Sequence, residues 1–328
     1  MERIDAASIN QSEQSYSGAV ELFEMRCRSL NLSPNTLLWY AEVLKCFTAF
    51  LSTHPDNPLP RKTKPTHIRA YLDYLHNKTT KIGRKVAPGS VKRFYVALKS
   101  FYGFLERERV ILSNPVALIK KPKAPKVILR PLSGEHIASL LAQFDTKSFT
   151  GLRDWAMTVL LLDSGLRLSE MLGIRTQDIN WAENGVNVMG KGSKERTVNF
   201  GAKVKKALWD YKQRRGDLTG QDFFFVDHYG RPVKKRWYQQ VLARRGKSAG
   251  IEGVRISPHT MRHTFAVQYI MNGGDAFSLQ RLLGHSSMET VTIYVGLANR
   301  DVAQQHRKFS PLDRMESVPG SVMRVRLK

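Results

Sequence analysis

Apolar side chains recur at the three- and four-residue spacing of amphipathic helices through residues 15–118. The pattern predicts four helices, at about residues 16–30, 34–51, 68–76 and 90–108. Ser33 is expected to cap the second helix and Thr66 the third, and Pro34 suits a first helical position because no partner awaits its missing N–H there. The side chains predicted to face the core are Ala19, Leu22, Phe23, Cys27, Leu37, Tyr40, Leu44, Phe47, Leu51, Val91, Phe94, Leu98, Phe101 and Leu105. We therefore expect a small all-helical domain at residues 15–118, preceded by a polar, flexible arm at residues 1–14.

A basic, proline-rich segment at residues 119–130 follows the helical domain. Proline interrupts both helices and strand pairing, so we expect an extended interdomain linker. Its lysines include Lys121, Lys123 and Lys126, and their charge suits a strap lying along a phosphate backbone. A linker that is merely solvated is the alternative.

Helical and alternating patterns are mixed in residues 131–309. Ser133 is expected to begin a helix, and further helices are predicted at residues 154–163, 202–214 and repeatedly between 235 and 308. Strand character at residues 186–189 and 196–200 predicts a β-hairpin closed by residues 190–194, and residues 223–226 predict another short strand. The fold class that we expect is mainly α with a small β-sheet, with an all-helical first domain and a mixed α/β second domain.

The tail at residues 310–328 alternates Met323, Val325 and Leu327 with arginines. Alternation favours an added strand. A disordered basic tail is the alternative.

The net charge of the chain limits the classes of partner that we expect it to bind. Fifty-two Lys and Arg oppose 28 Asp and Glu, which gives a formal net charge of +24 and a pI near 10.2. Such self-repulsion is typical of proteins that bind a polyanion, and the basic residues are spread over the whole chain rather than collected in one tail. Nucleic acid is the leading partner, and an anionic membrane surface or acidic proteins are the alternatives.

The two cysteines, Cys27 and Cys46, lie in apolar helical patterns, so we expect both in the core and no disulfide framework. The polar N-terminus has no signal-peptide pattern, and the longest apolar run is too short to span a bilayer. We expect a cytosolic protein, associated with the nucleoid if it is bacterial.

Three segments of the second domain carry groups suited to phosphate chemistry. Arg167 follows a glycine-containing bend at the predicted start of a helix, where anions are favoured. His259 and Arg262 are three residues apart and share a helix face. His285 ends an LLGH segment, and Tyr294 follows nine residues later. Taken singly, each has a simpler interpretation as a surface ion pair, a helix cap or a core residue.

In this order, the segments resemble the tyrosine recombinases, also called phage-type integrases, over nearly the whole chain. The resemblance rests on the arginine of GLRLSE, a lysine in a GKG hairpin, His-x-x-Arg, LLGH and the tyrosine after it. The layout is most similar to Xer-like and small mobile-element integrases. It implies a core-binding, SAM-like first domain and a tyrosine-recombinase catalytic domain.

The resemblance also implies roles for the catalytic residues. Arg167 and Arg262 would clamp the scissile phosphate, with His259 and His285 as further donors. Lys191 would protonate the leaving 5′ oxygen, although Lys194 lies close to it in sequence. Glu170 would anchor Arg167 or a neighbouring helix cap. Tyr294 would attack the phosphorus and form a 3′-phosphotyrosine, and no cofactor or metal is expected to take part.

The partner implied is double-stranded DNA, bound by four protomers on two duplexes. The resemblance also implies that the tail at residues 310–328 docks onto a neighbouring protomer. Integration, excision or transposition of a mobile element is the expected task, with Xer-like dimer resolution as an alternative. A type IB topoisomerase and a DNA-binding protein without catalysis are further alternatives. The candidate DNA contacts outside the catalytic set are Lys45, Lys92, Arg93, Lys99, Lys121, Lys123, Lys126, Lys194, Lys234, Lys235 and Arg236.

Overall fold

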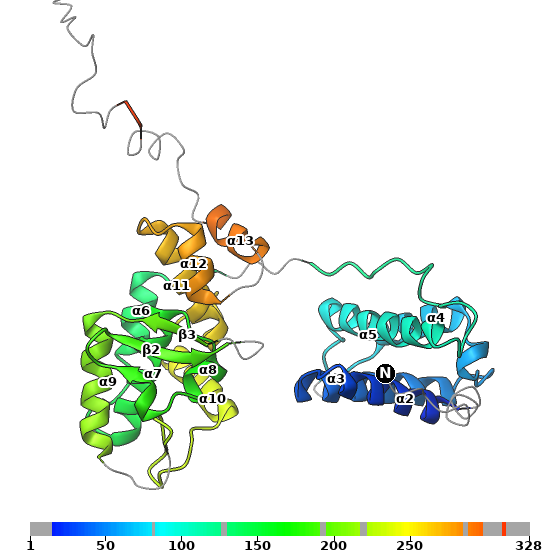
Figure 1. The fold of residues 1–328 in the computed structure, drawn as a ribbon, viewed down its shortest axis with the longest axis horizontal. Coiled ribbons are helices and arrows are strands. Elements are labelled where there is room, and N and C mark those ends of the chain that lie inside the picture. The colour runs from blue at the N-terminus through cyan, green and yellow to red at the C-terminus, as the bar shows by residue number, and fades with distance from the viewer. Residues whose placement is uncertain are drawn as a thin grey trace, which may run out of the picture. The chain divides into compact units, whose positions relative to one another are not determined.

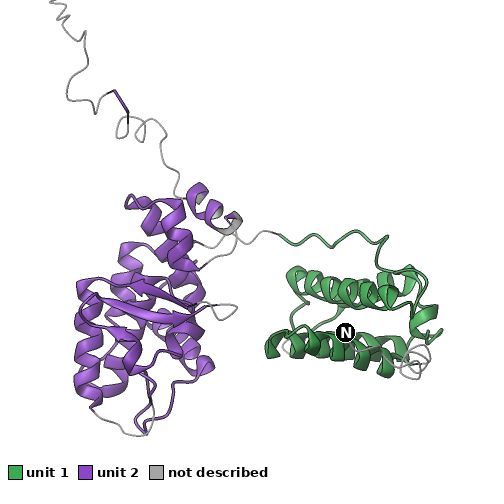
Figure 2. Cartoon of the chain, viewed as in Figure 1, with its two compact units in different colours: residues 1–127 green, residues 128–328 purple. Residues whose placement is uncertain are grey.

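The computed structural model describes residues 15–80, 83–125, 130–190, 195–216, 222–284, 288–297 and 310–312. The chain divides into two compact units, residues 1–127 and residues 128–328 (Figure 2). The predictions for the arm at residues 1–14 and for the tail beyond residue 312 lie outside the described residues. None of the described helices combines the length and apolar character needed to cross a membrane.

The described part of the first unit consists of helices, as the spacing predicted (Figure 1). They are α2 (Tyr16–Ser29), α3 (Pro34–Ser52), the short 3₁₀ helix η1 (Pro60–Lys62), α4 (Pro65–Asn77) and α5 (Pro88–Arg107). Ser33 caps α3 as expected, since its side chain accepts a hydrogen bond from the Thr36 N–H. The cap predicted at Thr66 is wrong. α4 begins at Pro65 and its N-cap is Lys64, two residues before Thr66; His67 Nδ1 accepts the Lys64 N–H at 3.0 Å, which closes the first turn.

An aromatic core holds this unit together. Phe23 contacts the rings of Tyr40 and Phe101 edge-on, at centroid separations of 5.0 and 5.5 Å. Most predicted core positions are buried, whereas Leu37, Tyr40 and Phe94 are only partly buried against the same cluster. The core position predicted for Cys46 is wrong, because its side chain is exposed. Cys46 is two residues beyond the buried Leu44, roughly 200° around the helix, and so faces away from the core.

The described part of the second unit mixes helices with a three-stranded antiparallel sheet of order β1-β2-β3. Its elements are α6 (Gly134–Leu141), α7 (Phe149–Ser164), α8 (Leu168–Leu172), η2 (Thr176–Asp178), β1 (Ile179–Asn180), β2 (Gly185–Met189), β3 (Glu195–Asn199), α9 (Ala202–Arg215), α10 (Lys235–Ser248), α11 (Pro258–Met271), α12 (Ala276–Leu283) and α13 (Glu289–Leu297). The predicted hairpin strands are confirmed as β2 and β3, which pair Met189 with Glu195 and Val188 with Arg196. The mainly helical fold class is therefore confirmed.

The short strand predicted at residues 223–226 is wrong. Phe224 and Phe225 are buried, as the apolar run suggested, but the segment has only isolated bridges at its two ends. The Phe224 N–H donates to the Ile174 carbonyl at 2.8 Å, and the Val226 N–H donates to the Tyr211 hydroxyl at 3.1 Å. These backbone groups bond to a loop and to a side chain rather than to a neighbouring strand. Apolar composition alone was therefore not enough to predict a strand here.

Helix α7 lies at the centre of the second unit. It packs against α9 and α11, and side chains on several of its faces, including Ala156, Met157, Leu160 and Leu161, are almost fully buried. A helix that is apolar over most of its circumference is held on all sides. The residues that follow α7 are thus anchored to the best-packed part of the unit.

Gly246 offers a test of this packing. A Cβ at Gly246 in α10 would lie 2.4 Å from Cγ1 of Ile256. Alanine normally stabilises a helix interior by about 1 kcal/mol relative to glycine, but overpacking costs about 1–3 kcal/mol. We therefore expect Gly246→Ala to lower the melting temperature of the second unit in calorimetry. The double variant Gly246→Ala/Ile256→Ala should lose less stability than the two single losses added together. A raised melting temperature for Gly246→Ala would contradict the close contact between residue 246 and Ile256.

Candidate active site

The turn between α7 and α8 places Arg167. Gly165 ends α7 with φ 61°, and a Cβ there would lie 2.3 Å from Cδ1 of Phe265, so only glycine fits this left-handed position. The chain then reverses, and Arg167 becomes the N-cap of α8. Its side chain is 35% exposed, which keeps the guanidinium within reach of solvent.

Glu170 holds Arg167 in this turn. Its carboxylate accepts the Arg167 backbone N–H and Arg167 Nη1, both at 2.8 Å. Burial raises the pKa of Glu170, but hydrogen bonds from Arg196 and Arg167 outweigh it and hold the pKa below its ordinary value. Glu170 is therefore ionised at neutral pH, and the anchoring role predicted for it agrees with these contacts.

Arg262 approaches the same turn from α11. Its side chain is buried, with Nη1 donating to the Gly165 carbonyl at 2.6 Å and Nη2 donating to the Leu283 carbonyl at 2.7 Å. Burial, with the nearby charge of Arg167 second, lowers the pKa of Arg262 to about 10. The guanidinium thus stays charged at neutral pH, so the site keeps a buried cation.

Arg196 is a residue that the sequence interpretation missed. It lies in β3, and its Nη1 and Nη2 each donate to one carboxylate oxygen of Glu170 at 3.0 Å. Its Nε donates to the Leu282 carbonyl at 3.2 Å. The signal was the strand alternation, since Arg196 shares the inward side of β3 with the buried Val198. A charged side chain at an inward position needs a partner, and here the partner is a buried carboxylate.

Tyr294 lies on α13, which packs against α11 and α12. Its side chain is only 5% exposed and belongs to an apolar cluster with Val267, Leu283 and Val291. The His263 ring lies 5.3 Å from the Tyr294 ring. Burial raises the pKa of Tyr294, and the charge of Arg262 acts in the opposite direction. The phenol is therefore protonated at neutral pH.

The remaining predicted catalytic residues differ in what the structure describes. His259 is exposed on the first turn of α11, three residues before Arg262 on the same continuous helix. Lys191, Lys194 and His285 lie outside the described residues. Their neighbours are described: Met189 pairs with Glu195 across the hairpin, and Gly284, with φ 61°, precedes His285.

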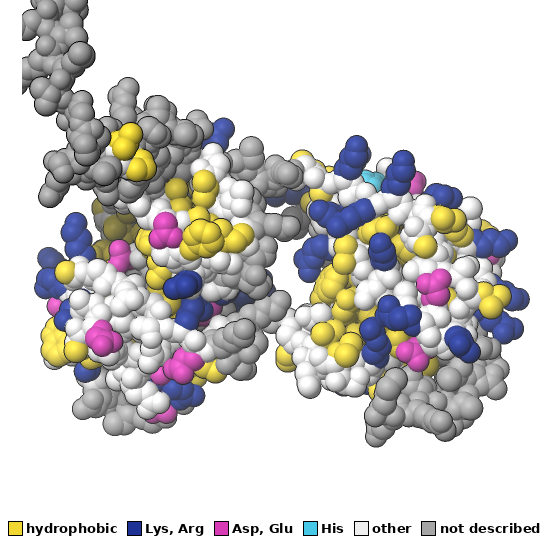
Figure 3. All heavy atoms as spheres, turned by 45° about the horizontal axis from the view of Figure 1, so that its top comes forward, with side chains coloured by type: hydrophobic (Ala, Val, Ile, Leu, Met, Phe, Trp, Pro, Cys, Tyr) yellow, Lys and Arg dark blue, Asp and Glu magenta, His cyan; other side chains and the backbone are white. Residues whose placement is uncertain are grey.

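The candidate DNA contacts are surface residues wherever the structure describes them. Lys92 is partly buried, and the exposed ones are Lys45, Arg93, Lys99, Lys121, Lys123, Lys234, Lys235 and Arg236. Lys126 lies outside the described residues. The guanidinium carbon of Arg93 lies 5.6 Å from the centre of the Trp39 ring, within the range of a cation–π contact. Figure 3 shows many basic side chains on the presented face of the first unit.

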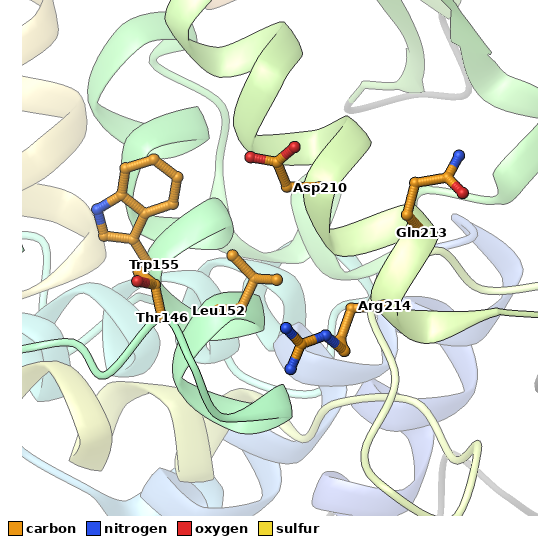
Figure 4. A pocket seen from close by; sticks show the side chains of 6 residues that line it. All are labelled: Thr146, Leu152, Trp155, Asp210, Gln213 and Arg214. Carbon is orange, nitrogen blue, oxygen red and sulfur yellow. The ribbon is translucent and has the colours of Figure 1, made fainter.

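Two other features of the described residues contain none of the predicted catalytic residues. Figure 4 shows a pocket lined by Thr146, Leu152, Trp155, Asp210, Gln213 and Arg214, none of which belongs to the arginine cluster. His54, Asp56 and His67 bring metal-ligating atoms within 4.8 Å of one another. However, the Nδ1 atoms of both histidines accept backbone N–H groups, so Nε2 carries the proton in each neutral ring and has no lone pair for a metal.

Comparisons with known proteins cover both units. Residues 130–300 match the phage integrase family, and residues 20–111 match the phage integrase N-terminal SAM-like domain. The chain is 35% identical over 284 residues to tyrosine recombinase XerD of Lacticaseibacillus casei, covering 85% of this chain and 94% of that protein. It is also 35% identical over 286 residues to tyrosine recombinase XerC of Myxococcus xanthus, covering 85% of this chain and 92% of that protein.

A solved structure has the same fold. The integrase of transposon Tn1549, in complex with a circular intermediate DNA, aligns with a TM-score of 0.71 at 18% identity, over 90% of this chain and 99% of that one. Fold, motifs and relatives together define an enzyme of the tyrosine recombinase class. The chain belongs to the phage integrase family, which confirms the resemblance read from the motifs.

The two carbonyls held by Arg262 suggest a test. Arg262→Lys keeps a charge but cannot reach both Gly165 and Leu283, so we expect the rate of covalent adduct formation with nicked DNA to fall by about 100-fold. Arg255→Lys changes an exposed arginine just before the same helix and should leave the rate unchanged. Equal rates for Arg262→Lys and the parent would remove Arg262 from the site.

Proposed function

We propose that the enzyme cleaves and rejoins double-stranded DNA at specific sites, with Tyr294 as the nucleophile. The observation that carries this is the convergence of Arg167 and Arg262 on the turn after α12, directly beside the helix that bears Tyr294. A scissile phosphodiester develops negative charge on its non-bridging oxygens as it is attacked, and two guanidinium groups are suited to neutralise that charge.

In the proposed step, the Tyr294 oxygen forms a bond to phosphorus as the bond from phosphorus to the 5′ oxygen breaks. The phenol proton is lost to the surroundings, and the 5′ oxygen takes up a proton from Lys191, with Lys194 as the alternative donor. Arg167, Arg262, His259 and His285 contact the phosphate oxygens. The phosphotyrosine keeps the bond energy, and a 5′ hydroxyl of a second strand reverses the step, so no ATP is consumed.

We assign DNA recognition to both units. The linker lysines and the exposed basic residues of α3, α5 and α10 are suited to phosphate contacts, which position a protein on a duplex. Four protomers on two duplexes follow from the resemblance, because each cleaved strand must exchange with a strand of a second site. Because its substrate would be DNA, the enzyme would act where cellular DNA is accessible.

Two biological tasks remain as proposals. Integration, excision or transposition of a mobile element is the first, supported by the shared fold with a transposon integrase. Xer-like dimer resolution is the second, favoured by the XerD and XerC relatives. Sequencing the DNA captured on Tyr294 in cells separates them: junctions of one movable segment support the first task, and a single fixed chromosomal site supports the second.

The nucleophile is tested by Tyr294→Phe. Removing the hydroxyl should abolish the covalent adduct on a nicked duplex while leaving the affinity for that duplex unchanged. Tyr269→Phe is the matched control, because it removes a partly buried hydroxyl that bonds Ser278 on the neighbouring helix. Adduct formation by Tyr294→Phe would refute the assignment.

The contacts of the first unit are tested by salt dependence. Lys92→Gln/Lys99→Gln should make the slope of log affinity against log salt shallower by about 2, since each phosphate contact contributes about 0.9. The control is Lys203→Gln/Lys206→Gln on α9, where Lys206 already pairs with Asp210 at 3.1 Å. An unchanged slope for the α5 variant would place those lysines off the DNA.

A further inference from the structure

Arg196 links three elements that carry the proposed chemistry. From β3 it reaches Glu170 on α8 with two donors and the Leu282 carbonyl at the end of α12 with a third. Its side chain is 15% exposed and that of Glu170 is 5% exposed, so the pair is largely shielded from solvent. A shielded bidentate pair fixes both partners in one geometry, which a surface ion pair does not.

Glu170 passes this constraint to Arg167. The same two carboxylate oxygens that accept from Arg196 also accept the Arg167 backbone N–H and Arg167 Nη1. Four donors therefore share one carboxylate. If the Arg196 fork is removed, Glu170 loses two of them and gains rotational freedom, and Arg167 loses the fixed partner that orients its guanidinium.

The turn at Gly284 gives an independent observation. A Cβ at Gly284 would lie 3.0 Å from Cζ of Arg196 and 3.1 Å from its Nη1, so the guanidinium rests directly against this glycine. The Gly284 carbonyl accepts Arg167 Nη2 at 3.2 Å. Arg196 thus braces the turn from one side while Arg167 binds it from another, and the next residue along the chain is His285.

We propose that Arg196 is a positioning residue for the phosphate clamp: it holds Glu170 and the turn at residues 282–284 so that Arg167 meets the scissile phosphate in one fixed orientation. The inference rests on the proposed function. Arg196 itself does not touch the phosphate, and its effect is transmitted through Glu170 and the Leu282 carbonyl. Lysine cannot replace it, because one ammonium cannot reach both carboxylate oxygens and the carbonyl together.

The test compares cleavage rates of one protein preparation on three nicked duplexes. The first has an ordinary scissile phosphate. The second has a methylphosphonate, which removes the charge from a non-bridging oxygen. The third has sulfur at the 5′ bridging position, whose thiolate leaves without a proton donor. Ratios between substrates do not depend on how much of the variant is folded.

We expect Arg196→Gln to slow cleavage of the ordinary phosphate by about 100-fold, the scale that misplacement by about 1 Å produces. The loss should shrink at least about tenfold on the methylphosphonate, because less charge needs a clamp, and should persist on the sulfur substrate. The cleavage rate of Arg196→Lys should be close to that of Arg196→Gln. The control Arg231→Gln breaks an exposed Arg–carboxylate pair with Asp227 and should match the parent on all three substrates.

Three results would overturn the inference. An equal loss on all three substrates would mean that Arg196 only supports the fold. Relief on the sulfur substrate would mean that it positions the proton donor in place of the clamp. Full activity of Arg196→Lys would mean that charge alone suffices. The proposed function has its own test, and it is contradicted if Tyr294→Phe still forms the adduct. Cleavage by Arg196→Gln at the rate of the parent would contradict only this inference.

Discussion

At the carboxyl end of α12, the carbonyls of Leu282, Leu283 and Gly284 accept hydrogen bonds from Arg196, Arg262 and Arg167 respectively. The last carbonyls of a helix have no intrahelical partner and form the negative end of its dipole, so cationic donors are favoured there. The three arginines come from β3, α11 and the α7–α8 turn. One helix end therefore gathers, in three dimensions, cationic groups that are almost 100 residues apart along the chain.

Two of these three arginines share one buried carboxylate. Among the described residues, Glu170 is the carboxylate that the ion pairs of Arg167 and Arg196 share, and Arg262 donates to the Gly165 and Leu283 carbonyls. The lowered pKa of Arg262 reflects its burial first and its proximity to Arg167 second. In the proposed function the cluster binds a phosphate, and its hydrogen bonds are already formed without one. Preorganised donors of this kind need no reorganisation as charge develops.

Local patterns predicted the helices, the hairpin and the Ser33 cap, because each depends on residues adjacent in sequence. The motif residues Arg167, His259, Arg262 and Tyr294 were found by their order along the chain. Arg196 was missed because its role depends on Glu170 and Leu282, which are 26 and 86 residues away. The prediction of a strand at residues 223–226 was wrong for the same reason, since the backbone partners of this segment include Ile174 and Tyr211. Tertiary partners, rather than propensity, decided both cases.

The burial of Tyr294 has a chemical consequence. A phenol with a raised pKa is neutral at the pH of the cell, so in the proposed attack its proton would leave as the bond to phosphorus forms. Leu283 connects this residue to the clamp: its carbonyl binds Arg262, and its side chain packs in the same cluster as Tyr294. A shift of the turn after α12 would therefore move the proposed nucleophile and the arginine proposed to bind the phosphate together. In the proposed function, one short segment of backbone therefore sets both the attack geometry and the charge stabilisation.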